Sequence, residues 1–153
     1  MKKKASKPTK KSMQKVRGFT CGAFDLLHAG HHMMLKEAKK KCDHLVVFLQ
    51  TDPSIDSPEY RGKQKNKPIQ SLKERRIQLE GCRYVDEIIV YTTEADLYKK
   101  LKKVPLDIRI IGADWKGKKF TGHDLPIKVY YNSRDHGFST TELRKRIKDA
   151  PMA

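Results

Sequence analysis

Five segments of the chain are rich in β-branched and aromatic residues and are predicted to be strands. They cover residues 16–21, 44–50, 85–91, 107–112 and 127–132. The segment HLVVFLQ at 44–50 is a continuous apolar run, which is typical of a strand buried on both faces of a sheet. The polar stretch 51–70 contains two Asp-Pro or Ser-Pro steps and several lysines, which indicates an irregular loop.

Four helices are predicted between and after these strands. They cover residues 33–42, 71–82, 94–104 and 139–149. Ser71 and Ser139 stand at two of the expected helix starts, and Glu74 and Glu142 follow three residues later. This spacing predicts a capping box at both helices, in which each side chain binds the backbone N–H of the other residue.

Strands that alternate with helices predict an α/β fold. We expect a Rossmann-like three-layer sandwich with a five-stranded, mostly parallel sheet. Ligands of such sheets bind beyond the carboxyl ends of the strands. Candidate site residues therefore lie in the segments that follow strands, at 22–32, 51–70, 112–123 and 132–141.

Length and composition fit one globular domain. The chain has 153 residues, of which 37% are hydrophobic and 34% charged, and no apolar run approaches the ~20 residues that span a bilayer. The basic N-terminus is not followed by the apolar segment of a secretory signal. Cys21, Cys42 and Cys82 lack metal-binding spacing and are typical of reduced thiols in a cytoplasmic protein.

Positive charge is concentrated at the N-terminus. Residues 1–17 hold eight Lys and Arg residues and no acidic residue, in a chain with a net charge of +16. We expect residues 1–15 to form a basic disordered tail and residues 16–150 to form the folded domain. The tail is either a solvated arm or a contact for nucleic acid or an acidic membrane. The positive charge of the rest of the chain indicates an anionic ligand.

The segment CGAFDLLHAGHH, residues 21–32, joins the first strand to the first helix. Gly22 permits a tight exit from the strand, and Gly30 permits close approach to the backbone. A helix N-terminus favours phosphate because its N–H groups are unpaired and its dipole is positive. His28 and His31 are three residues apart, so both imidazoles face the same side and can donate to phosphate oxygens as neutral rings or as cations.

Two other interpretations of these histidines stay open from spacing alone. In the first interpretation, the imidazoles are structural caps of the helix. In the second, His28, His31 and His32 hold a zinc ion. Adjacent His31 and His32 diverge on a helix, and neither Glu nor Cys completes the ligand set.

Four motifs in order resemble one enzyme family. The pattern G-x-F-D-x-x-H-x-G-H at 22–31 resembles the signature of the cytidylyltransferase-like nucleotidyltransferases, and RDHGFSTTELRKRI at 134–147 resembles their R-x-x-G-x-S-T-T segment. The segments 111–118, IGADWKGK, and 75–88, RRIQLEGCRYVDEI, are similar to segments of the small glycerol-3-phosphate cytidylyltransferases. The resemblance covers about residues 16–148. Ala23 replaces a common threonine, and RDHG replaces the more usual arginine-threonine-x-glycine.

This resemblance implies transfer of CMP from CTP to a small phosphomonoester, with glycerol 3-phosphate as the first choice and pyrophosphate as the leaving group. His28 and His31 would stabilise the α-phosphate in the transition state. The hydroxyl groups of Ser139, Thr140 and Thr141, with the N-terminus of the last helix, would hold the β- and γ-phosphates. A homodimer is also implied.

The resemblance implies further contacts. Mg²⁺ would bridge the triphosphate, and Asp25 would orient a histidine, a water or the metal. The residues that would contact the nucleotide are Gly22, Ala23, Phe24, Asp25, Gly30, Gly112, Asp114 and Trp115. Further catalytic cations would be Lys63, Lys65 and Arg134. Acceptor contacts would come from Lys67, Arg75 and Arg83. The lysine-rich loop is either a clamp that closes on the substrates or a solvated loop.

Two rival functions remain at this point. An adenylyltransferase of the same fold, acting on a sugar phosphate or a cofactor precursor, shares the G-x-S-T-T segment. A basic nucleic-acid-binding module explains the charge, but the chain lacks the interleaved aromatic residues of single-strand binders, and the histidine motif would have no role.

Overall fold

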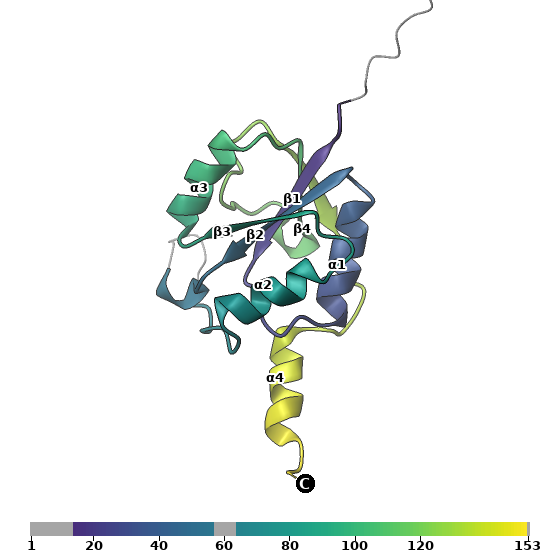
Figure 1. Ribbon diagram of the computed structural model, residues 1–153, viewed down its shortest axis with the longest axis vertical. Coiled ribbons are helices and arrows are strands. Elements are labelled where there is room, and N and C mark those ends of the chain that lie inside the picture. Colours follow the sequence, from purple (N-terminus) through teal and green to yellow (C-terminus); the bar gives the residue numbers. More distant parts are fainter. Residues whose placement is uncertain (1–13, 57–63, 153) are drawn as a thin grey trace, which may run out of the picture.

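The computed structural model describes residues 14–56 and 64–152, and five strands in it form one parallel sheet (Figure 1). The strands are β1 Arg17–Gly22, β2 His44–Gln50, β3 Glu87–Tyr91, β4 Ile108–Gly112 and β5 Lys128–Asn132. Their order across the sheet is β3-β2-β1-β4-β5, and every neighbouring pair is parallel. The predicted α/β fold is confirmed, with a fully parallel sheet.

Within the described residues, three helices and two short 3₁₀ turns lie between the strands, and a fourth helix follows the last strand. The helices are α1 Ala29–Lys39, α2 Leu72–Glu80, α3 Glu94–Lys103 and α4 Thr140–Asp149, and the turns are η1 Pro53–Ile55 and η3 Ala113–Trp115. The capping box predicted for Ser71 and Glu74 is present at α2. At α4 the Ser139 side chain accepts the N–H of Glu142 at 3.0 Å.

Helix α1 starts at Ala29, four residues before the prediction. The helical pattern of apolar residues begins at Met33, but His28 caps the helix with its imidazole and starts it earlier. Histidine is not among the residues that usually cap helices. The first helical turn therefore lies inside the histidine motif, so the motif itself is the N-terminus of α1.

Strand β2 is buried on both faces, as its sequence predicts. Leu45, Val47 and Leu49 belong to the core on the side of α1 and α2. Val46 and Phe48 belong to the core on the side of α3. Strand β2 is thereby covered by two hydrophobic layers, which holds this part of the carboxyl edge of the sheet rigidly.

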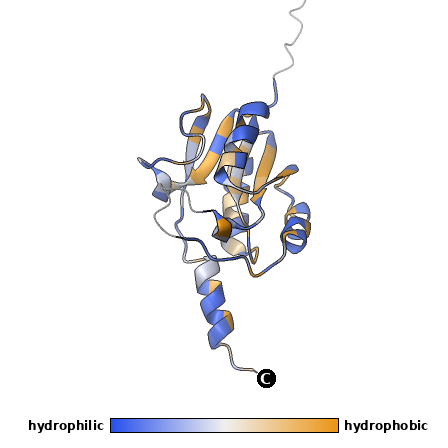
Figure 2. Ribbon diagram, turned by 90° about the vertical axis from the view of Figure 1, so that its left-hand side faces the viewer, coloured by the Kyte–Doolittle hydropathy of each residue, from blue (hydrophilic) through white to orange (hydrophobic). Residues whose placement is uncertain are grey.

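Helix α4 projects away from the body of the molecule (Figure 1). None of its residues is buried, and Figure 2 colours it mostly as hydrophilic, whereas hydrophobic colour is concentrated on the strands. Only the start of α4 meets the carboxyl edge of the sheet. Within the described residues, no helix is long and apolar enough to cross a membrane.

Candidate active site

A cavity of about 710 Å³ lies at the carboxyl edge of the sheet. Its walls come from the loops after β1, β4 and β5, from the start of α1 and from the start of α4. Fourteen residues predicted for the site line it: Gly22, Ala23, Phe24, Asp25, His28, Gly30, His31, Lys65, Gly112, Trp115, Arg134, Ser139, Thr140 and Thr141. A cavity of this size is ordinary for a small-molecule ligand.

The structure does not bring all predicted residues to this cavity. Lys67, Arg75, Arg83 and Asp114 are described but do not line it. Lys63 lies outside the described residues. The guanidinium carbon of Arg83 lies 5.1 Å from the centre of the Tyr84 ring, a cation–π distance.

The backbone between β1 and α1 adopts an unusual conformation. Phe24 has φ of 50° and Leu26 has φ of 51°, a region that non-glycine residues rarely adopt. Two contacts hold this loop: the Leu26 N–H donates to the side-chain oxygen of Gln70 at 2.8 Å, and the Phe24 ring lies 5.3 Å from that of His31. Strained backbone that its surroundings hold in place is characteristic of ligand sites.

His28 is fixed by both of its ring nitrogens. Its Nδ1 accepts the N–H of Gly30 at 3.1 Å, which makes His28 the N-cap of α1. Because Nδ1 is an acceptor, the neutral ring carries its proton on Nε2. This Nε2 lies 3.2 Å from Oγ1 of Thr140 in the first turn of α4. His28 thus connects the starts of the two helices that face the cavity.

His31 is held in the same tautomer. Its Nδ1 accepts the backbone N–H of His28 at 3.3 Å, so its proton also sits on Nε2. Burial is the main cause that lowers the pKa of His31, to about 3, and the charge of His28 lowers it further. Burial also lowers the pKa of His28. Both imidazoles are therefore neutral donors at pH 7, which decides between the two protonation states left open by the sequence.

Gly30 permits this close packing. A Cβ atom at this position would lie 3.0 Å from the rings of His28 and His136 and from the carbonyl oxygen of Phe138. At Gly112, the end of β4, a Cβ atom would lie 2.5 Å from Oδ1 of Asp114. At Gly30 the neighbours include a backbone oxygen and packed rings, whereas at Gly112 the exposed Asp114 side chain can move away.

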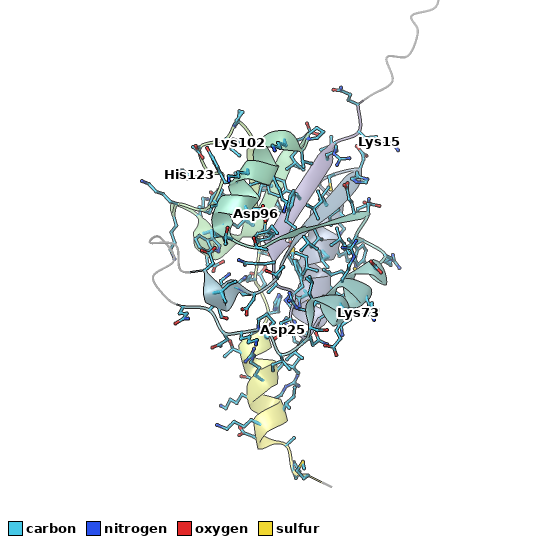
Figure 3. The ribbon with its side chains drawn as sticks, turned by 60° about the vertical axis from the view of Figure 1, so that its left-hand side comes forward. Lys15, Asp25, Lys73, Asp96, Lys102 and His123 are labelled. Atoms are coloured by element: carbon cyan, nitrogen blue, oxygen red, sulfur yellow. The ribbon has the colours of Figure 1, made fainter. Side chains whose placement is uncertain are left out.

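The Asp25 carboxylate joins neighbouring segments of the cavity wall, and its predicted role in orienting a histidine, a water or the metal stays a prediction. Its carboxylate accepts the backbone N–H groups of Ile69 and Gln70, each at 2.9 Å. Arg144 of α4 lies 3.3 Å from the same carboxylate and also donates to the carbonyl of Lys67. Asp25 is nearly buried where α4 joins the body (Figure 3). Both carboxylate oxygens take part in joining the loop before α2 to α4.

Arg75 is a buried residue that binds backbone carbonyls, and its predicted contact with the acceptor stays a prediction. Its side chain is 1% exposed. Its guanidinium donates to the carbonyl oxygens of Ala23, Gln50, Thr51 and Gln70. These carbonyls belong to the segments that follow β1 and β2 and precede α2, so Arg75 holds three cavity-forming segments in place.

A zinc site is not supported by the described residues. Among them, no group of three or more His, Cys, Asp or Glu side chains is placed to hold a metal ion. Both Nδ1 atoms of His28 and His31 are occupied by backbone N–H groups. The zinc interpretation of the histidine motif is therefore wrong for this arrangement.

Comparisons with known proteins identify the family of the chain. The sequence profile of the cytidylyltransferase-like family matches residues 19–146. The chain belongs to this family. The glycerol-3-phosphate cytidylyltransferase of Bacillus subtilis is 36% identical over 135 residues, which cover 88% of this chain and 98% of that protein.

Other relatives of this cytidylyltransferase-like chain differ in length. The bifunctional protein HldE of Campylobacter concisus is 39% identical over 132 residues, which are 86% of this chain but only 27% of that protein. The chain therefore spans about a quarter of HldE. A solved lipopolysaccharide core biosynthesis protein of Thermoplasma volcanium superimposes with a TM-score of 0.57 and 31% identity, covering 78% of this chain and 95% of that one.

The cavity has an excess of positive charge. Its described lining carries the cations Lys65, Arg109, Arg134 and Arg144, against the carboxylates Asp25 and Glu94. Arg134 lies 3.7 Å from Asp114, and both side chains are more than half exposed. Such a cavity raises the local concentration of an anionic ligand.

Sequence reasoning missed several residues of the cavity. His136 and Gly137 lie inside the R-x-x-G-x-S-T-T segment, and Arg144 lies one helical turn after Thr140. The motif could therefore have pointed to all three residues. Arg109 and Asn132 lie within strands β4 and β5, and no sequence motif marks them as site residues. The side-chain oxygen of Asn132 is buried and has no hydrogen-bond partner in the described protein.

Proposed function

We propose that this nucleotidyltransferase moves CMP from CTP to a small phosphomonoester, with glycerol 3-phosphate as the first candidate acceptor. An oxygen of the acceptor phosphate attacks the α-phosphorus of CTP. The bond from the α-phosphorus to the bridging oxygen breaks, and pyrophosphate leaves. No covalent enzyme intermediate is needed, so the chain must position the substrates and stabilise charge.

The observation that carries this proposal is the pair of imidazoles with identical tautomers. His28 and His31 lie at a helix start, and each has its proton on Nε2 because Nδ1 accepts a backbone N–H. A neutral Nε2–H donates to an anionic oxygen and does not release its proton to it. Two fixed donors therefore stabilise the negative charge that builds up on the α-phosphate.

The start of α4 supports a site for the leaving pyrophosphate. Ser139, Thr140 and Thr141 line the cavity, and the amide groups of the first turn carry partial positive charge. Oγ1 of Thr140 lies 3.2 Å from Nε2 of His28. The residue that would hold the leaving phosphates is therefore next to the residue that would hold the α-phosphate. Arg134 and Lys65 supply further positive charge for the triphosphate.

Mg²⁺ would enter with the nucleotide and be ligated mainly by phosphate oxygens and water. The described residues do not offer a protein ligand set for it, since Asp25 is bonded to backbone N–H groups and to Arg144. The chemistry that the ion supplies is neutralisation of phosphate charge.

Preference for CTP is supported by the joint presence of the family segments at 75–88, 111–118 and 134–147, and by the Bacillus relative. Cytosine offers an N4–H donor beside two acceptors, and backbone groups near Gly112 and Trp115 would read this pattern. A base that leaves those groups unpaired binds worse, so discrimination is large. Equal kcat/KM values for CTP and ATP with one acceptor, or a preference for ATP, would contradict this proposal.

Adenylyl transfer to a sugar phosphate is the second candidate. It is favoured by the likeness to a lipopolysaccharide core biosynthesis protein, because lipopolysaccharide is built from sugars. A pyrophosphate-release screen of CTP and ATP against glycerol 3-phosphate, sugar 1-phosphates, phosphocholine and phosphoethanolamine separates the candidates. A homodimer, and a contact of the basic tail with nucleic acid or an acidic membrane, stay predictions.

A further inference from the structure

The cavity extends beyond the histidines onto the face of the sheet that α3 covers. This part, here called the α3-side extension, is lined by Cys21, Glu94, Arg109, Phe120 and Thr121. The phosphate chemistry proposed above assigns none of these residues a role. The extension lies in the same cavity as the histidines, so a molecule whose phosphate is at the histidines can place its other end there.

Arg109 is the unusual residue of the α3-side extension. It comes from the second position of β4, opposite Phe19 of β1, and is 7% exposed. Its guanidinium carbon lies 5.5 Å from the centre of the Phe19 ring and 4.7 Å from that of Phe120. Its NH1 group donates to the carbonyl of Thr121.

The hydrogen bonding of Arg109 is incomplete. Its Nε is buried and has no hydrogen-bond partner, and no carboxylate of residues 14–56 or 64–152 forms an ion pair with its guanidinium. A buried charge without a counter-ion is costly to keep. A buried, incompletely bonded cation on the wall of a cavity indicates a polar ligand group beside it.

The rest of the α3-side extension offers both donors and acceptors. Oγ1 of Thr121 donates to Oε2 of Glu94 at 2.6 Å. Burial raises the pKa of the Cys21 thiol to about 11, an effect that the charge of Glu94 increases and the charges of Arg109 and Lys65 oppose. The Cys21 thiol is therefore uncharged at pH 7, and the charged groups that act on it are the cations Arg109 and Lys65 and the carboxylate Glu94.

This arrangement suits a ligand with several hydroxyl groups. A hydroxyl both donates and accepts, so it can pair with the guanidinium, the carboxylate and the threonine at once. The Phe120 ring supplies an apolar face for the C–H groups of a carbon chain or sugar ring. A quaternary ammonium head has no hydrogen-bonding group and would meet the buried Arg109 cation.

We propose that the α3-side extension holds the body of the acceptor and that Arg109 selects a polyhydroxylated phosphate ester, a polyol or sugar phosphate, over one with a cationic head. This inference rests on the proposed function and names the acceptor class of that site. It holds whether the nucleotide is CTP or ATP.

The test compares Arg109→Met with the wild type. Methionine keeps apolar contact with the two phenylalanine rings but removes the charge and the donors. Arg76→Met is the matched control, because Arg76 is exposed on α2 and outside the cavity. Thr121→Val is a second variant that removes one hydroxyl with little change in size. For each protein, KM is measured for the acceptor and for the nucleotide, and acceptor binding is measured by calorimetry.

We expect the wild type to prefer glycerol 3-phosphate or a sugar 1-phosphate over phosphocholine and phosphoethanolamine by about 100-fold or more in kcat/KM. Arg109→Met should raise the KM of the hydroxylated acceptor by about 10- to 100-fold, the loss expected for a charged hydrogen bond, and leave the nucleotide KM unchanged. Thr121→Val should act in the same direction, with a smaller rise.

Two results would overturn the inference: an acceptor KM in Arg109→Met no higher than in Arg76→Met, or a wild-type preference for a cationic head. If Arg109→Met does not fold, an unchanged acceptor KM in Thr121→Val overturns it instead. If no pair of nucleotide and acceptor releases pyrophosphate, the proposed function fails, and calorimetry then decides. Binding of glycerol 3-phosphate or a sugar 1-phosphate that weakens in the variants upholds the inference, and its absence in the wild type overturns it.

Discussion

The imidazole rings of His28 and His31 are stacked, with centres 3.8 Å apart and planes 23° from parallel. Each ring offers its Nδ1 to a backbone N–H of the α1 start, so the backbone fixes the tautomer of both. Stacking this close would be unfavourable for two imidazolium ions. The pair therefore works as two neutral donors whose positions are set before substrate binds.

Loss of either imidazole should reduce turnover strongly. We expect His28→Ala and His31→Ala each to lower kcat by about 10²-fold or more, the scale for one fixed donor to a transition-state oxyanion. His32→Ala is the control, because His32 is the next residue on α1 but does not line the cavity. Steady-state pyrophosphate release gives the rates. Near-normal turnover in both variants would remove the histidines from the mechanism.

Stability should depend on pH through His31. The unfolded imidazole titrates near 6.5, whereas burial lowers the pKa to about 3 in the fold. Between these values the unfolded chain binds the extra proton, so the contribution of the neutral ring is present above pH 6.5 and is lost as pH falls toward 3. Urea unfolding of the wild type and His31→Gln should show a difference in unfolding free energy that shrinks from pH 7 to pH 4. A difference that does not change with pH would contradict the buried neutral state.

Arg75→Met should destabilise the fold and leave four carbonyl oxygens without their donor. We expect a loss of about 3 kcal/mol in unfolding free energy, because each unpaired buried group costs about 1–3 kcal/mol and water replaces part of the loss. Arg76→Met on the next residue of α2 should change it by less than about 0.5 kcal/mol, since the Arg76–Glu80 pair is exposed. Chemical denaturation measures both. If Arg75→Met keeps wild-type stability but loses acceptor binding, Arg75 contacts the acceptor after all.

Deletion of residues 1–13 should leave kcat unchanged, whereas deletion of residues 1–17 should lower stability. The second cut removes Arg17, whose side chain reaches the carbonyl of Pro105 at 2.8 Å and Glu87 at 3.0 Å, and whose N–H donates to Asp107. Activity and melting temperature of the two truncations separate these effects. Loss of kcat in a folded protein that lacks only residues 1–13 would place the basic tail in the site.

The fold was predictable because the pattern of an apolar strand followed by an amphipathic helix is repeated along the chain. Strands such as 44–50 are continuously apolar, and their alternation with helices leaves few other topologies. The start of α1 was predicted four residues late, because an imidazole cap has no propensity signal.

Only part of the site was predictable. Motifs name residues but do not say where their hydrogen bonds go. The sequence assigned Asp25 and Arg75 to ligands and did not show that both bind backbone groups. Arg109 was missed because a single charge inside an apolar strand has no motif, and only the tertiary structure shows that its Nε is unpaired.

Nucleotidyl transfer through attack on the α-phosphorus is the central claim, and the fate of two labels tests it most directly. The protein is incubated with glycerol 3-phosphate and CTP that carries radioactive phosphorus at either the α or the γ position. The account predicts that α-label enters the glycerol-containing product, that γ-label leaves as pyrophosphate, and that His31→Ala slows both about equally. Transfer of γ-label to the acceptor, or release of γ-label as orthophosphate without a labelled product, would contradict it.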